Sequence, residues 1–247
     1  MNEIISSLKN RKSVRVFEQK PIGSKEKAAI LDAAIQAPTA GNMTLYTIID
    51  VTNQKLKDTL AVTCDNQPFI AKAPLVLVFC ADYYRWMQAF KKHVDDVRNP
   101  SYGDLFLCNA DALIAAQNAV VAAESLGIGS CYIGDITENF EKHRELFDLP
   151  DYVVPACMLC FGYPAKSQIE RQKPQRFKAE DIVFENTYNK EKADSMEDML
   201  SKRQNIDKDK IGDYISKFCT RKHNSDFSIE MSRSCKAMTD FFTGGNA

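Results

Sequence analysis

The sequence predicts an α+β protein, and three stretches carry that prediction. Two continuous apolar runs, at 73–82 and 152–161, have the length and the residue types of buried strands. A third stretch, from about residue 105 to residue 126, is apolar on most of its helical circumference, which is typical of a central helix. With 247 residues, 45% of them hydrophobic, the chain is long enough for one large domain or two small ones.

The N-terminal quarter is expected to hold helices on both sides of an extended segment. The clearest helix covers 24–38, where Ser24 can cap the first turn, apolar residues recur at helical spacing and Pro38 ends the pattern. The neighbouring elements are expected to be a short amphipathic helix at 2–10, an extended stretch at 11–17, a strand at 46–51 and a helix at 54–64.

The middle of the chain continues the alternation of strands and helices. The buried strand at 73–82 is followed by a predicted helix from Tyr83 to Val97 and a loop at 98–104. The central helix should end at Gly127, because glycine readily adopts the left-handed conformation that closes a helix. A loop is expected at 129–136, then a helix at 137–149 with Thr137 as its cap, then the strand at 152–161.

The last sixty or so residues differ in composition from the rest. Long polar side chains dominate from Lys166, and the chain is strongly charged after Tyr188 before a final helical stretch at 228–242. This region is too polar for a core of its own but holds isolated apolar residues such as Phe218 and Phe241. We therefore predict a main domain at 1–188 and a helical extension at 189–247 that packs on that domain or on a dimer partner.

Charge and hydropathy limit the partners of the chain. Lys and Arg total 32 and Asp and Glu total 33, so the formal net charge is −1. A protein that coats nucleic acid or an anionic membrane needs a basic excess, so neither partner is expected. No segment reaches the run of about 18 apolar residues typical of a membrane helix, and the polar N-terminus does not resemble a secretory signal. A cytoplasmic location is expected.

Eight cysteines are scattered along the chain, mostly inside apolar runs, as in proteins of a reducing compartment. One pair, Cys157 and Cys160, has the C-x-x-C spacing of metal and redox motifs. Because this pair lies on a predicted strand, its two side chains should point to opposite faces. No metal site is therefore expected.

The stretch "RKSVRVF" alternates polar and apolar residues from Arg11 to Phe17. In an extended backbone, Arg11, Ser13 and Arg15 share one face. Two guanidinium groups and a hydroxyl form a set of donors that suits a phosphate group. The alternative is a solvated basic edge strand with Lys12 and Lys20 nearby.

Four further stretches place polar groups in loops. Asn42 follows Gly41, and its amide could meet the edge of a heteroaromatic ring or serve only as a turn residue. Gln67 precedes a buried strand, "GSCYIGD" offers successive backbone N–H groups, and "QKPQRF" offers Lys173 and Arg176 to an anion. The glycines at 127–134 follow a helix instead of a strand, so they do not form a dinucleotide fingerprint. One ligand with a phosphate and a polar heterocycle accounts for all five stretches.

These motifs resemble the FMN-dependent nitroreductases, in the larger nitroreductase and flavin-reductase branch. That family opens with R-x-S-x-R-x-[FY], here "RKSVRVF", and continues with A-P-[ST]-x-x-N-x-Q, here "APTAGNMT" with Thr44 in place of the glutamine. The stretch "AQNAVVAAESLGIGSCYIG" and the K-P-x-R-F element followed by "IVFENTY" are also similar. The resemblance implies a central mixed β-sheet flanked by helices, and a homodimer whose C-terminal extensions wrap the partner.

The resemblance also implies a role for each candidate residue of an FMN-binding domain at 1–188. The FMN phosphate would be held by Arg11 and Ser13, by the backbone of Lys12, and by Lys173 and Arg176 from the other side. Arg15 would lie near N1 and O2 of the ring. Asn42 and Gln67 would contact the ribityl chain or the pyrimidine edge. The backbone N–H groups of Ile133, Gly134 and Asp135 would face N5 and O4. Arg15 would be the catalytic residue.

The reaction implied is a ping-pong, two-electron reduction. NADPH or NADH would be a transient hydride donor, and the acceptor a small molecule such as a nitroaromatic or a quinone. The flavin carries the redox chemistry, and solvent would provide protons. The alternatives are a flavin or enone reductase on the same scaffold, or a flavin-binding protein without turnover.

Overall fold

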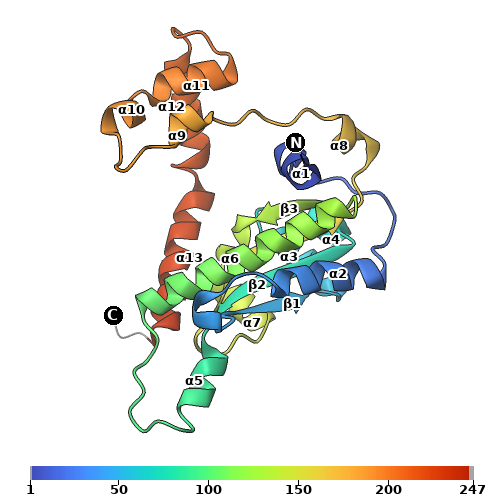
Figure 1. Cartoon of the computed structure of the whole chain (residues 1–247), viewed down its shortest axis with the longest axis vertical. Helices are drawn as coiled ribbons and strands as arrows, with labels where there is room; N and C mark the ends of the chain where they lie inside the picture. Colours follow the sequence, from blue (N-terminus) through green and yellow to red (C-terminus); the bar gives the residue numbers. More distant parts are fainter. Residues whose placement is uncertain (1, 245–247) are drawn as a thin grey trace. The chain divides into compact units, whose positions relative to one another are not determined.

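Four strands form the centre of the larger of two units in the chain (Figure 1). The computed structural model describes residues 2–244. Its larger unit comprises Met1–Arg171 with Glu230–Ala247, and its smaller unit comprises Gln172–Ile229. The predicted boundary at residue 188 falls inside the smaller unit, and the division into an FMN-binding domain and an extension stays a prediction.

The sheet has the order β1-β2-β4-β3, and every neighbouring pair is antiparallel. Its strands are β1 (Tyr46–Asp50), β2 (Leu75–Asp82), β3 (Gly129–Ile133) and β4 (Val153–Gly162). The expectation of a mixed sheet was therefore wrong for these four strands. The one parallel pairing found within residues 2–244 is an isolated bridge between Ser13 and Ser130.

The two central strands are continuous apolar runs because both faces of the sheet are covered. All eight residues of β2 are buried. Leu77 and Phe79 belong to the core on one face, whereas Val76 and Val78 belong to the core on the other. Cys157 and Cys160 likewise fall in different clusters, as the strand alternation predicted.

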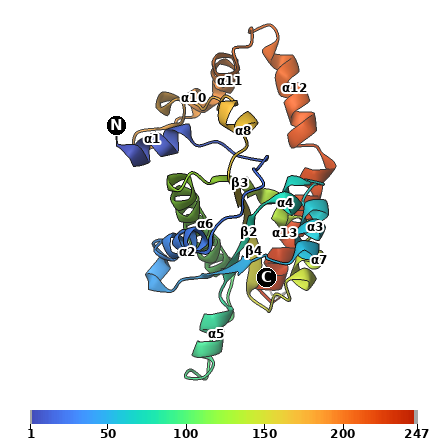
Figure 2. The same ribbon diagram turned by 90° about the vertical axis from the view of Figure 1, so that its right-hand side faces the viewer.

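Helices cover the two faces in separate groups (Figure 2). One face carries α2 (Ser24–Ile35) and the long α6 (Tyr102–Ser125). The other carries α3 (Gln54–Thr63), α4 (Phe69–Lys72), the short 3-10 helix η2 (Gly134–Thr137) and α7 (Phe140–Leu146). By length and composition α6 could cross a membrane, but its alanines at 112, 115, 116, 119 and 123 are buried in the core, as predicted for a central helix.

Four local predictions were wrong. Two concern helix caps: α2 is capped by Gly23 and α7 by Asn139, not by Ser24 and Thr137. The helix expected to reach Val97 ends earlier, as α5 (Tyr84–Phe90), because the residues after it are charged and exposed and offer no apolar stripe to bury. The loop expected at 129–136 is instead strand β3 followed by η2. The glycines of this stretch suggested a turn, but Gly129 lies in a strand, where its missing side chain leaves room for Val14.

The "RKSVRVF" segment follows α1 (Glu3–Asn10) and lies along the sheet at β3 and the end of β4. Val14 donates its N–H to the carbonyl of Ser130 at 2.9 Å. A Cβ atom at Gly129 would lie 2.5 Å from Cγ2 of Val14, and one at Gly162 would lie 2.6 Å from Cδ1 of Phe17. Both glycines are therefore required for the segment to lie this close to the sheet.

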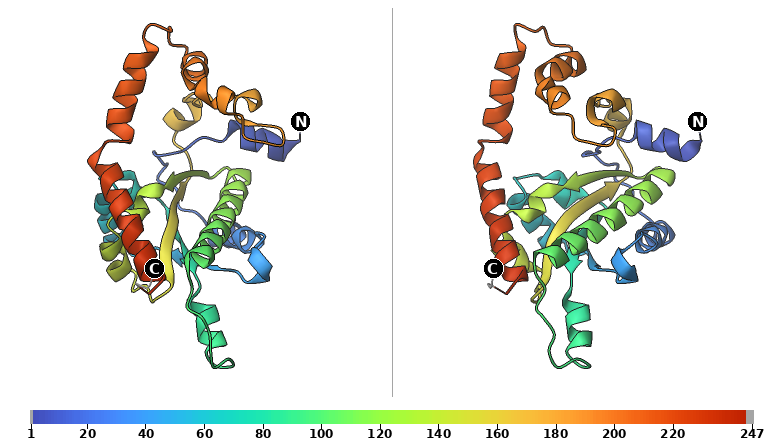
Figure 3. Two further views of the ribbon diagram at one scale, coloured as in Figure 1. Left: turned by 90° about the vertical axis from the view of Figure 1, so that its left-hand side faces the viewer. Right: turned by 60° about the vertical axis from the view of Figure 1, so that its left-hand side comes forward.

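The smaller unit is helical, with α9 (Ala179–Ile182), α10 (Lys190–Asp194), α11 (Met196–Gln204) and α12 (Ile211–Lys222). The last helix, α13 (Asp226–Phe242), belongs to the larger unit from Glu230 onward (Figure 3). There Phe242 is fully buried, and the ring of Phe241 lies 5.4 Å from that of Phe140. This helix packs on the core of its own chain, and wrapping of a partner subunit stays a prediction.

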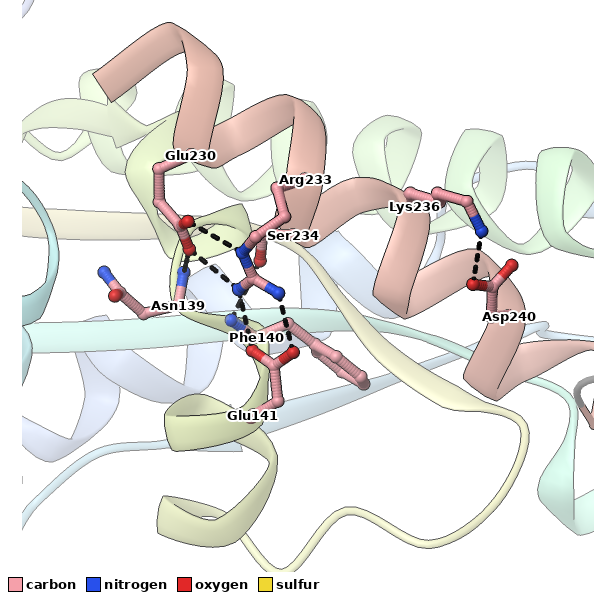
Figure 4. A network of polar contacts seen from close by, with 8 residues as sticks. All are labelled: Asn139, Phe140, Glu141, Glu230, Arg233, Ser234, Lys236 and Asp240. Atoms are coloured by element: carbon pink, nitrogen blue, oxygen red, sulfur yellow. Dashed lines mark hydrogen bonds and ion pairs between the residues drawn. The ribbon is translucent and has the colours of Figure 1, made fainter. Parts of the chain in front are cut away.

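An ion-pair network fixes α13 against α7 (Figure 4). Arg233 donates two hydrogen bonds to the carboxylate of Glu141, at 2.8 and 2.9 Å, and two more to Glu230. Glu230 in turn accepts from the backbone N–H of Asn139 at 3.1 Å, and Ser234 accepts from that of Phe140 at 2.8 Å. The side chains of α13 thus serve as acceptors for the N–H groups at the start of α7.

Candidate functional site

The candidate site starts where α1 ends and the extended segment begins. Arg11 is half-buried, and its Nε atom is buried without a hydrogen-bond partner in the described part of the chain. Glu124 on α6 lies nearby: burial raises the pKa of its carboxyl group, and the charge of Arg11 lowers it. Lys12 points elsewhere, since its Nζ donates to the backbone carbonyls of Ile169 and Arg171.

Arg171 is a member of this region that the sequence did not reveal. Its Nη2 donates to the carbonyl oxygen of Ser13, while its Nε is buried and has no partner among residues 2–244. The same is true of the hydroxyl of Ser130, whose backbone bridges to Ser13. Three buried polar atoms that lack partners, on Arg11, Ser130 and Arg171, therefore lie around the "RKSVR" segment. No local pattern marks Arg171, because its neighbour in space is more than 150 residues away in sequence.

Val14 and Arg15 differ in exposure, whereas Arg11, Lys12 and Ser13 are all half-buried. Val14 is buried against the sheet, whereas Arg15 is exposed. The backbone N–H of Arg15 donates to Oε1 of Gln168 at 3.2 Å, and its guanidinium group lies 5.9 Å from the centre of the Phe69 ring. Arg15 therefore reaches Phe69, the first residue of α4, two residues after Gln67.

Gln67 and the turn after β3 form the other side of the site. Nε2 of Gln67 donates to Oδ2 of Asp135 and to the carbonyl of Cys64, each at 2.9 Å. Ile133 ends β3 and is buried, and the next residue, Gly134, is exposed. A Cβ atom at Gly134 would have no neighbour within 4 Å among the described residues, so the backbone there borders open space.

Asn42 does not join this group within its own chain. Asn42 is exposed at the end of the 3-10 helix η1 (Ala40–Asn42), with a left-handed φ of 58°. Its loop is attached to Asp111 on α6, whereas Arg11 lies near Glu124 on the same helix. These two α6 positions are 13 residues apart, which is about 20 Å at the helical rise of about 1.5 Å per residue.

Lys173 and Arg176 belong to the smaller unit. Arg176 is exposed, and its Nη1 donates to the carbonyl of Pro174 at 3.4 Å. Their predicted role at the phosphate stays a prediction.

The chemistry of the donor set fits an organic phosphate attached to a ring system. Two arginines with unpartnered Nε atoms and a free hydroxyl gather at one end, and an amide with exposed backbone lies at the other. Burial raises the pKa of the Cys131 thiol and that of the Cys64 thiol, so neither is activated as a nucleophile. Within residues 2–244, no group of three or more His, Cys, Asp or Glu side chains is arranged to hold a metal ion.

Comparisons with known proteins agree on one group of enzymes. The sequence model of the Nitroreductase family matches residues 8–163. The chain is 35% identical over 193 residues to an FMN reductase (NADPH) of Bacillus subtilis, covering 76% of each chain. It is 35% identical over 188 residues to an oxygen-insensitive NADPH nitroreductase of Salmonella typhimurium, covering 76% of this chain and 75% of that one. The NADPH:FMN oxidoreductase from Vibrio harveyi, solved in complex with NAD+, superimposes with a TM-score of 0.72 at 28% identity, covering 82% of this chain and 86% of that one.

Proposed function

The chain belongs to the nitroreductase family, and we propose that it is an FMN-dependent NAD(P)H oxidoreductase that reduces nitroaromatics, quinones or related electron-poor acceptors. Its relatives are named as NADPH-dependent reductases of FMN and of nitro compounds, which supports both the cofactor and the nicotinamide donor. The observation that carries the assignment is the group of unpartnered donors on Arg11, Ser130 and Arg171 beside the "RKSVR" segment.

The phosphate of FMN is assigned to this group of donors. Arg11 and Arg171 supply guanidinium groups whose Nε atoms have no other partner among residues 2–244, and the hydroxyl of Ser130, which is bridged to Ser13 through the backbone, is likewise without one. Charge-assisted contacts of this kind are the strongest hydrogen bonds that a protein offers to a phosphate. Lys12 orders the chain by binding the carbonyls at 169 and 171, and Lys173 and Arg176 are the further cations that the family pattern supplies.

The ring is assigned to the surface between Arg15 and the turn after β3. The flavin, when bound, accepts a hydride from the nicotinamide and passes two electrons to the acceptor. Arg15 would place a fixed positive charge at the edge where the reduced ring is negative, which favours two-electron reduction. Backbone N–H groups at Ile133, Gly134 and Asp135 would face the opposite edge, where the absent side chain of Gly134 leaves room for close approach. Protons would come from solvent.

A homodimer is proposed because the larger unit leaves apolar surface uncovered. Helix α6 exposes Phe106 (75%), Leu107, Leu113 and Ile114, although its other side is buried in the core. Contiguous apolar surface of this kind is typical of a subunit interface. The distance between Arg11 and Asn42 within one chain also suggests that Asn42 completes the site of the second copy. We expect the enzyme in the cytoplasm, where its eight free thiols would stay reduced.

The function is tested by purifying the protein and adding NADPH or NADH without oxygen. We expect a yellow protein that releases FMN on denaturation and loses its absorbance near the flavin band on addition of the donor. Steady-state rates with a nitroaromatic or a quinone should give parallel double-reciprocal lines, since both substrates use one face of the flavin in turn. Preferred reduction of free FMN or of an enone would favour the alternative reductases, and a flavin that no donor bleaches would indicate a binding protein without turnover.

Mixed dimers test whether two copies share each site. One copy carries Arg11→Ala and Arg171→Ala, and the other carries Asn42→Gly, which keeps the left-handed backbone of residue 42 and removes its amide. If Asn42 acts across the interface, the heterodimer has one intact site and binds one FMN per dimer with wild-type affinity. If all three residues served the same chain, no intact site would form, and the best affinity would be that of the Asn42→Gly homodimer, about tenfold weaker than wild type.

A further inference from the structure

Helix α5 is hydrogen-bonded to the loop that precedes β1. The second residue of the helix, Arg85, donates through Nη2 to the carbonyl oxygen of Thr44, at 3.1 Å, and to that of Tyr46. The next residue, Trp86, donates its indole N–H to the carbonyl oxygen of Met43 at 2.7 Å. Two consecutive side chains of α5 therefore bind three carbonyl groups of one short segment, which fixes this segment relative to the helix.

Thr44 has a backbone conformation that threonine rarely adopts. Its φ angle is 53°, in the left-handed region, where the side chain of a β-branched residue crowds its own backbone. The N–H of Thr44 donates to the Thr39 hydroxyl at 2.8 Å, and its carbonyl oxygen accepts from Arg85. Both backbone polar groups of the strained residue are thus held by other side chains, and a strained backbone persists only where its surroundings hold it.

Two buried carboxylates anchor the side chains that hold Thr44. Asp111 on α6 accepts the hydroxyl proton of Thr39. Asp82, the last residue of β2, forms an ion pair with Nε of Arg85 at 3.3 Å. The two carboxylate residues are only 3% and 5% exposed, so neither is free to move with the loop. The strained residue is therefore held on its N–H side from α6 and on its carbonyl side from the sheet.

The hydrophobic core does not explain why residue 44 is strained. Leu45 and Tyr46 are buried, so their packing alone places the start of β1. A glycine at residue 44 would adopt the same φ without strain. Strained residues that their surroundings hold in place are typical of binding sites, where they keep the backbone ready for a ligand. Here the exposed residue beside the strain is Asn42, two positions before Thr44.

We propose that Arg85 and Trp86 are positioning residues, which hold the loop in the strained conformation from which Asn42 reaches the FMN of a second copy. This proposal rests on the proposed function, because it needs an FMN site that two copies share. Without the bonds from α5, Thr44 would relax toward a negative φ. The peptide groups beside it would then turn, and the Asn42 amide would move. Arg85 and Trp86 act through the loop and not by touching the flavin.

The first experiment measures the FMN affinity of four apoproteins: wild type, Arg85→Met, Thr44→Gly and the double variant. Arg85→Met should bind FMN about tenfold more weakly. Thr44→Gly should bind within about twofold of wild type and melt about 2–4 °C higher, because glycine adopts a positive φ without strain. Adding Arg85→Met to Thr44→Gly should then weaken binding by less than about twofold. Equal losses in both backgrounds would show that Arg85 does not act through the strained residue.

Two further variants separate the bonds from packing and from charge. Trp86→Phe keeps an aromatic ring and removes the N–H group that binds Met43, so we expect about a fivefold loss of FMN affinity. Lys92→Met removes an exposed cation just beyond α5 and should bind FMN like wild type. A loss in Lys92→Met as large as that in Arg85→Met would assign the effect to charge and overturn the proposal. Wild-type affinity in Arg85→Met or in Trp86→Phe would refute the role of that residue.

Mixed dimers show at which site Arg85 acts. One copy carries Arg11→Ala and Arg171→Ala, and the other carries Arg85→Met. If Arg85 acts across the interface, the phosphate donors of the second copy meet the intact loop of the first, and one FMN binds per dimer with wild-type affinity. A best affinity equal to that of the Arg85→Met homodimer would show that Arg85 serves only its own chain, and would overturn the proposal. A wild-type protein that binds no FMN would instead refute the proposed function.

Discussion

Replacing Arg11 and Arg171 together by alanine should give a folded protein that no longer retains FMN. Each guanidinium group offers the phosphate a charge-assisted contact worth about 1.5–3 kcal/mol, so the pair accounts for roughly 3–6 kcal/mol, a loss of about 10²- to 10⁴-fold in affinity. Isothermal titration of the apoprotein with FMN measures this loss.

The double replacement should leave the core intact. Nε of Arg11 makes no hydrogen bond to the described residues, and the bond of Arg171 to the Ser13 carbonyl lies at the edge of the sheet. A charge-matched control, Lys25→Ala with Lys55→Ala, removes two exposed cations on α2 and α3 and should bind FMN like wild type. If the control loses as much affinity as the arginine variant, net charge and not the donor group holds the phosphate.

The core of the fold was predictable because its signals are local. Burial can be predicted from a single stretch of sequence in three elements. These are the continuous apolar runs of β2 and β4 and the small residues on the buried side of α6. The direction of strand pairing has no such local signal, and the mixed sheet that the family resemblance implied is antiparallel over these four strands. Strand β3 was missed for a related reason. Glycine often indicates a turn, but Gly129 lies in the strand because a larger side chain there would clash with Val14.

The site shows the same division between local and distant signals. The alternation of Arg11, Ser13 and Arg15 predicted a set of donors on one segment, and Gly129 and Gly162 allow that segment to lie close to the sheet. Ser130 and Arg171 were missed because only the folded chain brings them to Ser13. The pairing of Gln67 with Asp135 spans 68 residues, so the sequence could name both residues without revealing that one orients the other.

Asn42 illustrates the limit of residue type as a signal. Its type and position matched the family pattern, yet the same residue type also suits the left-handed backbone at 42. Its loop depends on a buried carboxylate that no motif identified. Asp111 on α6 is 3% exposed and accepts hydrogen bonds from the Thr39 hydroxyl and from the backbone N–H groups of Ala40 and Leu45, at 3.0 and 3.2 Å.

Asp111→Ala should therefore be the most destabilising of the single substitutions considered. It leaves the N–H groups of Ala40 and Leu45 without their acceptor, at a cost of about 1–3 kcal/mol for each buried group and roughly 3–5 kcal/mol in the free energy of unfolding overall. For a chain of this size, about 2–4 °C is lost per kcal/mol, so thermal unfolding should begin roughly 6–20 °C lower. Differential scanning calorimetry measures the shift.

The matched control is Asp32→Ala, which removes an exposed carboxylate from α2 and should change the free energy of unfolding by less than about 0.5 kcal/mol. Asp111→Asn should fall between the two, because its amide keeps one oxygen as an acceptor but turns an N–H₂ group toward backbone donors. Since the loop at 39–45 carries Asn42, Asp111→Ala should also weaken FMN binding well below its melting temperature. A variant that melts with wild type and binds FMN normally would show that water or a shifted backbone replaces the Asp111 carboxylate, and that the loop does not depend on it.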